Sequence, residues 1–120
     1  MEIYKEMPRQ KKNFKVNHSE SGDFWLDYIL LPFGYLYNAD IANAKKGDTI
    51  QLFNGGKYSI VSCRKIRIKS PEADLLSRMR YGITIAGALS RWKTNARLEG
   101  HGAQAISEDE CLWIVFEKLE

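Results

Sequence analysis

Cysteine, histidine and long apolar runs are scarce in this sequence, and each scarcity argues against a class of protein. Two cysteines and two histidines occur in 120 residues. Neither cysteine belongs to a Cys-x-x-Cys pair, so a disulfide scaffold and a zinc site are both disfavoured. The longest apolar run, residues 28–33, is far shorter than the ~20 residues that cross a bilayer. No signal peptide is visible. We expect a cytoplasmic protein with no metal, no cofactor and no membrane partner.

The residues that are present have the composition of one globular domain. Hydrophobic residues make up 44% and charged residues 28% of the chain, which argues against long disorder. A chain of this length usually forms a single domain with its own core. The first 23 residues are polar and basic. We therefore expect an N-terminal segment over residues 1–23, followed by one domain over residues 24–120.

Positive charge is concentrated in the middle of the chain. The net charge is only +3, but residues 45–97 hold twelve Lys and Arg against three Asp and Glu. Residues 98–120 hold one Lys against six Asp and Glu. This asymmetry favours a polyanionic partner. Solvated faces that keep a small domain soluble would give the same pattern.

Alternation and turn-forming residues predict a central hairpin. Residues 49–53 alternate, as in a half-buried strand. Asn54-Gly55 supplies the positive φ angles of a tight turn, and residues 58–69 form the return strand. Residues 113–116 are apolar on both faces and predict a buried or central closing strand. Shorter strands are expected at residues 14–16 and 35–37, whereas residues 24–31 fit either a helix face or a buried strand.

Two helices are predicted between the hairpin and the closing strand. Ser70 and Pro71 form a helix start, and Gly82 ends that helix. Thr84 caps a second helix over residues 85–96. The stretches 98–105 and 107–110 are predicted to be loops. Strands followed by a helical insert and a returning strand predict an α+β fold. We expect a small barrel-like sheet of mixed or antiparallel strands with one or two peripheral helices.

The return strand carries the sharpest candidate for a binding site. Lys65, Arg67 and Lys69 share one face of this strand, about 7 Å apart. Three cations at this spacing are comparable with successive phosphates of a single strand. Other basic residues extend the positive field: Lys45, Lys46, Arg91 and Lys93. Trp92 shares a helical face with apolar residues, which favours a core position over a stacking platform.

Candidates for catalysis are few. His101 lies between two glycines, which let the backbone approach a ligand closely, and Glu99 beside it could act as a general base. An incidental histidine in a surface loop fits the same residues. Cys63 and Cys111 are each interpreted as buried, unreactive residues.

Two stretches resemble a known family. Lys46-Gly47-Asp48-Thr49, followed by an alternating strand, a glycine-containing turn and a long basic strand, resembles the ASCH domains, a branch of the PUA-like superfamily. The later stretch, with Trp92, Leu98-Glu99-Gly100-His101-Gly102, an acidic turn and residues 111–117, is similar to their closing region. The resemblance covers residues 44–117. It implies a compact PUA-like β-barrel with peripheral helices, which binds RNA or a modified nucleotide in a cleft between barrel and helix.

The chain departs from one branch of that family. Some ASCH members resemble small amidohydrolases that act on acylated cytidine, using a Gly-Lys-Lys-Thr-type segment early in the domain and a later glutamate. Residues 30–44 contain neither Lys nor Thr, so the matching residues are missing. Residues 1–43 have no family assignment.

Three functions are therefore hypotheses at this point. The leading one is a non-enzymatic RNA- or nucleotide-binding module that uses the basic strand and the adjacent cleft. The second is a small hydrolase acting on a modified nucleoside, with Glu99 or His101 as base and a nearby lysine as partner. The third is a protein-interaction domain that docks through the acidic residues 108–110 and the basic centre.

Overall fold

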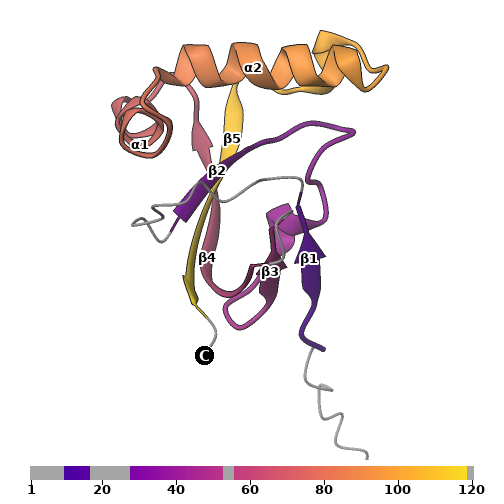
Figure 1. Cartoon of the computed structure of the whole chain (residues 1–120), viewed down its shortest axis with the longest axis vertical. Coiled ribbons are helices and arrows are strands. Elements are labelled where there is room, and N and C mark those ends of the chain that lie inside the picture. The colour runs from indigo at the N-terminus through magenta and orange to yellow at the C-terminus, as the bar shows by residue number, and fades with distance from the viewer. Residues whose placement is uncertain (1–9, 17–27, 53–55, 119–120) are drawn as a thin grey trace, which may run out of the picture.

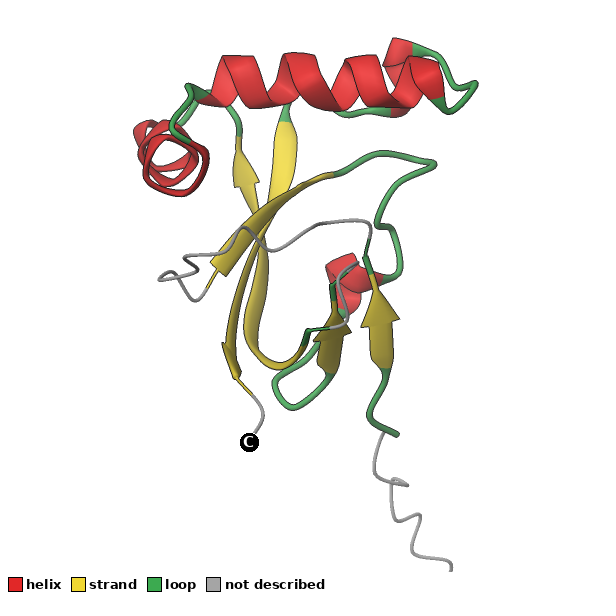
Figure 2. Ribbon diagram, in the orientation of Figure 1, coloured by secondary structure: helices red, strands yellow, loops and turns green. Residues whose placement is uncertain are grey.

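The computed structural model describes residues 10–16, 28–52 and 56–118. These residues form one sheet with two α-helices and two short 3-10 helices (Figures 1 and 2). In chain order the elements are β1 (Asn13–Lys15), β2 (Tyr28–Pro32), η1 (Ile41–Asn43), β3 (Thr49–Gln51), β4 (Lys57–Arg67), α1 (Pro71–Tyr81), α2 (Ile85–Leu98), η2 (Ala103–Ala105) and β5 (Glu110–Lys118).

The five strands form a mixed sheet in the order β1-β3-β4-β5-β2. β1 runs parallel to β3, and the other neighbours are antiparallel. The predicted α+β class is confirmed. β1 and β2 are the two edges, so the sheet is open over the described residues and the expected barrel is not confirmed. The closing strand lies between β4 and β2, as predicted for an apolar central strand.

A bulge in β4 fixes which side chains point to which face. The register with β5 shifts between Ile60 and Ser62, so one residue of β4 is extra at that point. Since side chains alternate along a strand, this shift changes the phase of the alternation. Ile60 before the bulge and Cys63 after it therefore contact the same hydrophobic cluster.

Two hydrophobic clusters cover the two faces of the sheet. The first packs Ile29, Leu31, Ile114 and Phe116 against residues of η1, β3 and the end of β1. The second packs the opposite face against both α-helices, with members that include Tyr28, Leu30, Ala73, Leu76, Ile85, Ala88 and Cys111. Figure 1 shows α2 lying across the ends of β4 and β5, with α1 viewed end-on beside it.

The helix signals in the sequence are confirmed. Ser70 accepts a hydrogen bond from the Ala73 amide, and Gly82 ends α1 in the left-handed conformation at φ 71°. Thr84 caps α2 by accepting from the Gly87 amide. α2 ends at Leu98, two residues later than expected, so the predicted loop begins later.

Side chains satisfy the open edge of β2. The Tyr81 hydroxyl accepts from the Leu30 amide at 3.0 Å and donates to the Leu30 carbonyl at 2.9 Å. Arg80 donates to the Tyr28 carbonyl at 3.2 Å, and Asn38 donates to the Pro32 carbonyl at 2.6 Å. Unpaired edge groups invite pairing with another chain. Here they are occupied from within the fold.

Four local expectations need correction or comment. Residues 35–37 are not a strand, because Gly34 and Tyr37 exchange backbone hydrogen bonds around a tight turn. The segment 24–31 forms a strand from Tyr28 onward, and its first four residues lie outside the described ones. The return strand stops at Arg67, so Lys69 lies in the following turn, outside the strand. The predicted Asn54-Gly55 turn also lies outside the described residues, although β3 and β4 pair as a hairpin requires.

Candidate functional site

Three hollows lie next to one another on the surface, and two of them are lined by α2. We call them together the α2 groove. The β1 hollow has a volume of about 460 Å³, the central hollow about 200 Å³ and the α1 hollow about 160 Å³. Val16 and Asn38 line both the β1 and the central hollow. Trp92 and Asn95 line both the central and the α1 hollow. The shared residues show that each hollow adjoins the next.

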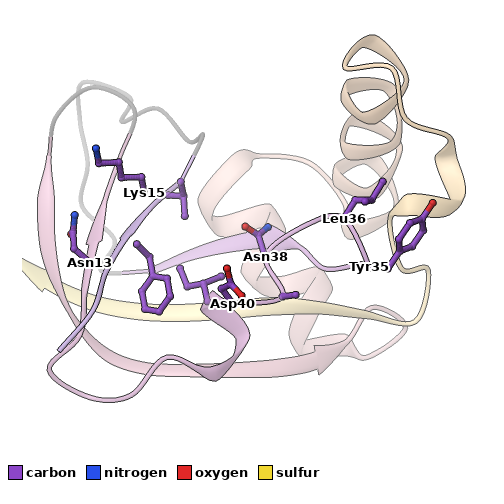
Figure 3. Close-up of a pocket in the computed structure, with 10 residues that line it drawn as sticks. Asn13, Lys15, Tyr35, Leu36, Asn38 and Asp40 are labelled. Atoms are coloured by element: carbon purple, nitrogen blue, oxygen red, sulfur yellow. The ribbon is translucent and has the colours of Figure 1, made fainter. Parts of the chain in front are cut away.

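The β1 hollow joins a strand to a loop (Figure 3). Asn13 and Lys15 come from β1 on one side, and Tyr35 and Leu36 come from the loop after β2 on the other. Tyr35 is 69% exposed, so its ring is accessible from solvent. Asp40 adds a carboxylate. This hollow therefore combines a cation, an anion and an exposed ring.

The central hollow is lined by one face of α2. Trp92, Asn95 and Glu99 are spaced three and four residues apart, so the helix brings them onto the same face. Glu99 is the C-terminal cap of α2. Tyr37 and Asn38 close the hollow from the turn after β2. The lining therefore offers aromatic rings, two amides and a carboxylate.

Tyr37, Glu99 and His101 form a contact cluster at this hollow. The Tyr37 hydroxyl donates to Glu99 Oε2 at 2.6 Å. The His101 ring lies edge-on to the Tyr37 ring, with centroids 5.8 Å apart. Desolvation, the hydrogen bond to Glu99 and the charge of that carboxylate raise the pKa of Tyr37 to about 12. The hydroxyl therefore stays protonated at neutral pH and keeps donating to Glu99.

The structure thus brings together the two candidate catalytic residues, Glu99 and His101, through Tyr37. The described residues that line the central hollow include no lysine. The hydrolase hypothesis requires a lysine beside the base, so this arrangement does not supply its expected partner. Holding and orienting a ligand is the role that the cluster's contacts support.

The basic residues of β4 lie away from the groove lining. Lys65 and Arg67 are exposed and share a face, as predicted. The Lys65 ammonium lies 5.2 Å from the centroid of the Phe33 ring. Arg67 and Lys69 line a separate hollow of about 410 Å³ together with Asp109 and Glu110. Asp109 and Glu110, which belong to the acidic turn 108–110, therefore lie beside these two cations in the fold, although they are about 40 residues away in sequence.

Other predicted cations also have acidic neighbours. Lys93 forms an ion pair with Glu108. The hydrogen bond and charge of Lys93, with a smaller effect of Lys69, lower the pKa of Glu108. Arg64, across from Trp113 in the sheet, lies 3.9 Å from Glu72. Lys45 and Lys46 are exposed beside the Gly47 turn, and among the predicted cations only Arg91 lines the α2 groove.

The two cysteines behave as the sequence predicts. Both are free, Cys111 is buried and Cys63 is half-buried. Desolvation raises the pKa of Cys63 to about 11 and that of Cys111 to about 12. Within the described parts of the chain, no three His, Cys, Asp or Glu side chains gather closely enough to hold a metal ion. No helix among those residues is long and apolar enough to cross a membrane.

Comparisons with known proteins add no relatives. No protein-family model, curated protein or solved structure matched this chain. The resemblance to the ASCH domains therefore stays a prediction.

Sequence reasoning missed several residues of the groove. Asn95 lies between Trp92 and Glu99 on one helical face, so helical spacing alone could have found it. Tyr37 meets the end of α2, and Lys15 meets the loop after β2, only in the folded chain. No spacing along the sequence marks them.

Proposed function

We propose that this protein is an RNA- or nucleotide-binding module that holds single-stranded RNA in the α2 groove. The observation that carries the proposal is the lining of the groove. Among the described residues, five aromatic side chains line its three hollows, and one cation lies in each of the two outer hollows: Phe14, Tyr35, Tyr37, Tyr81 and Trp92, with Lys15 and Arg91. Single strands are commonly held by aromatic rings on which bases stack and by cations along the backbone.

The charges of the groove indicate how the binding energy is divided. In the part of the lining that the structure describes, two carboxylates, Asp40 and Glu99, accompany the two cations. Because these charges cancel, contacts with phosphate add little to the binding energy. Base stacking therefore supplies most of the affinity. A site with two phosphate contacts on a single strand has a log–log salt slope of about −1.4 at most. We expect a slope no steeper than this.

The resemblance to the ASCH domains supports the same location. It implies a PUA-like barrel whose ligand lies between the barrel and a helix, and the central hollow lies between β2 and α2. The proposal extends the resemblance to this chain through Trp92, Glu99 and His101. The described strands form an open sheet, so the closed barrel belongs to the proposal alone.

The proposal is tested by fluorescence anisotropy with a labelled eight-nucleotide single-stranded RNA of mixed sequence. The groove variant replaces both cations, Lys15→Ala with Arg91→Ala. The matched control is Lys57→Ala with Arg97→Ala, two exposed cations outside the groove lining, one of them also on α2. Both variants remove two positive charges. We expect the groove variant to weaken binding about tenfold and to bring the salt slope close to zero.

The control variant should retain the wild-type affinity within about threefold, because it changes only the long-range field, which salt screens. Equal losses in the two variants would show that binding follows overall charge and not the groove. Absence of measurable binding by the wild-type protein at low salt would reject RNA binding altogether.

A further inference from the structure

We infer that the central hollow selects guanine over the other bases. The inference rests on the proposed function and adds the identity of the base. It starts from the volume of the hollow, about 200 Å³, which is below the roughly 300–1,000 Å³ of a pocket for a drug-sized ligand. A hollow of this size suits one planar ring system and leaves the sugar and phosphate in the neighbouring hollows.

The walls of the central hollow fit an unstacked base. Trp92 and Tyr37 supply aromatic surfaces, and Asn95 and Asn38 supply amides. Proteins that read single-stranded RNA stack a splayed base on aromatic rings and hydrogen-bond its Watson–Crick edge. The only charged group that lines this hollow among the described residues is the Glu99 carboxylate. The edge of the base that faces Glu99 must therefore donate hydrogen bonds to this carboxylate.

Contacts within the protein hold the Glu99 side chain in place. Tyr37 donates to Oε2, and the His101 ring packs edge-on against Tyr37. An ionised carboxylate only accepts hydrogen bonds and has about four lone-pair sites. After the bond from Tyr37, it can still accept from two adjacent donors of a ligand. Tyr37 is thus a positioning residue for Glu99.

The donor pattern of guanine matches this acceptor. Guanine presents N1–H and N2–H₂ side by side on its Watson–Crick edge. Adenine and cytosine each present one amino group beside a ring-nitrogen acceptor, and uracil presents one N–H between two carbonyls. A carboxylate facing those acceptors would be repelled, whereas guanine can donate two charge-assisted hydrogen bonds. A good bidentate pair gives about 1–3 kcal/mol of discrimination, or about 5- to 150-fold.

Competition by mononucleotides tests this inference. GMP, IMP, AMP, CMP and UMP displace the labelled RNA used above. We expect GMP to compete at least about fivefold better than AMP, CMP and UMP, with IMP in between because inosine lacks only the N2 amino group. Glu99→Gln should remove the preference for GMP from both sides, because the amide loses one of the two acceptors for guanine and no longer repels the ring nitrogen of adenine, so GMP should bind more weakly and AMP more tightly. The control Glu117→Gln changes an exposed glutamate on β5 outside the groove.

Tyr37→Phe separates positioning from stacking. This variant keeps the ring and loses the hydroxyl that holds Glu99, so the ratio of GMP affinity to AMP affinity should fall part of the way to one. Equal competition by all five nucleotides, unaffected by Glu99→Gln, would overturn guanine selection and leave nucleotide binding standing. Equal loss of every nucleotide in Glu99→Gln would also overturn it. Failure of both RNA and nucleotides to bind would reject the proposed function itself.

Discussion

Asp48 joins two segments of the chain through one buried carboxylate. Its side chain accepts from the Lys12 amide at 3.1 Å and from the Lys45 amide at 2.9 Å. Its own carbonyl accepts from the Ile60 amide at 2.7 Å. A buried carboxylate needs such donors, because losing water without them is costly. The turn Lys45–Asp48 could be predicted from Gly47, but the contact with Lys12 could not, since it depends on β1 lying parallel to β3.

The two thiols give a prediction on pH. Desolvation raises their pKa values to about 11 and about 12 for Cys63 and Cys111, and Cys63 Sγ donates to the Ile41 carbonyl at 3.2 Å. The folded state therefore favours the neutral thiol. Burial of the neutral thiols stabilises the folded protein in full below the pKa of a cysteine in the unfolded chain, near 8.5. This stabilisation is lost as the pH rises through the pKa values of the folded protein.

We expect the native protein at pH 8 to react with a chromogenic disulfide reagent roughly 100-fold more slowly than the same protein in denaturant, because only the thiolate reacts. The absorbance change in both conditions measures the two rates. Similar rates would contradict the buried positions of the cysteines. They would also reopen a nucleophilic role for Cys63 or Cys111.

At the scale of elements, β2 shows how tertiary contacts resolve an ambiguous pattern. Its sequence fits a helix face or a strand equally well. It becomes a strand because β5 pairs with it along one edge and side chains of α1 satisfy the other. Neither partner is visible within the segment itself. By contrast, the caps Ser70 and Thr84 act on neighbouring amides, so the starts of both helices could be predicted locally.

Replacing Tyr81 should weaken this edge. Tyr81→Phe keeps the ring and removes the hydroxyl that serves both polar groups of Leu30. Leaving these partly buried groups unpaired should lower the free energy of unfolding by about 1–3 kcal/mol. Urea denaturation followed by circular dichroism measures the change. Tyr35→Phe, at an exposed hydroxyl, is the matched control and should stay within about 0.5 kcal/mol of wild type. Equal midpoints for the two variants would show that the edge bonds add no stability.

At the scale of the whole molecule, folding changes the meaning of the charge pattern. The sequence separates a basic centre from an acidic end, and the fold places them side by side. Glu108 pairs with Lys93, while Asp109 and Glu110 share a hollow with Arg67 and Lys69. A count along the chain cannot detect this pairing, because it depends on the turn before β5 returning to the end of β4. The groove is likewise assembled from residues between Lys15 and Glu99 that share no contiguous motif.

The acidic turn should therefore restrain non-specific binding of polyanions. Glu108→Gln with Asp109→Asn removes two negative charges beside Lys93, Arg67 and Lys69. Each cation freed to contact a phosphate steepens the log–log salt slope by about 0.7 on a single strand. We expect this double variant to bind the labelled single-stranded RNA more tightly at low salt, with a slope steeper by about 0.7 to 2.

Anisotropy titrations across a series of salt concentrations measure the slope, and two further variants make the result specific. Glu117→Gln removes one negative charge at an exposed position outside this hollow and should leave the slope within about 0.3 of wild type, because distant surface charges are screened. Adding Arg67→Ala and Lys69→Ala to the acidic-turn variant should return the slope to within about 0.7 of the wild-type value, the remainder being the contribution of Lys93. If the slope stays steep without these two cations, the turn does not act on them, and the basic end of β4 has no part in binding RNA.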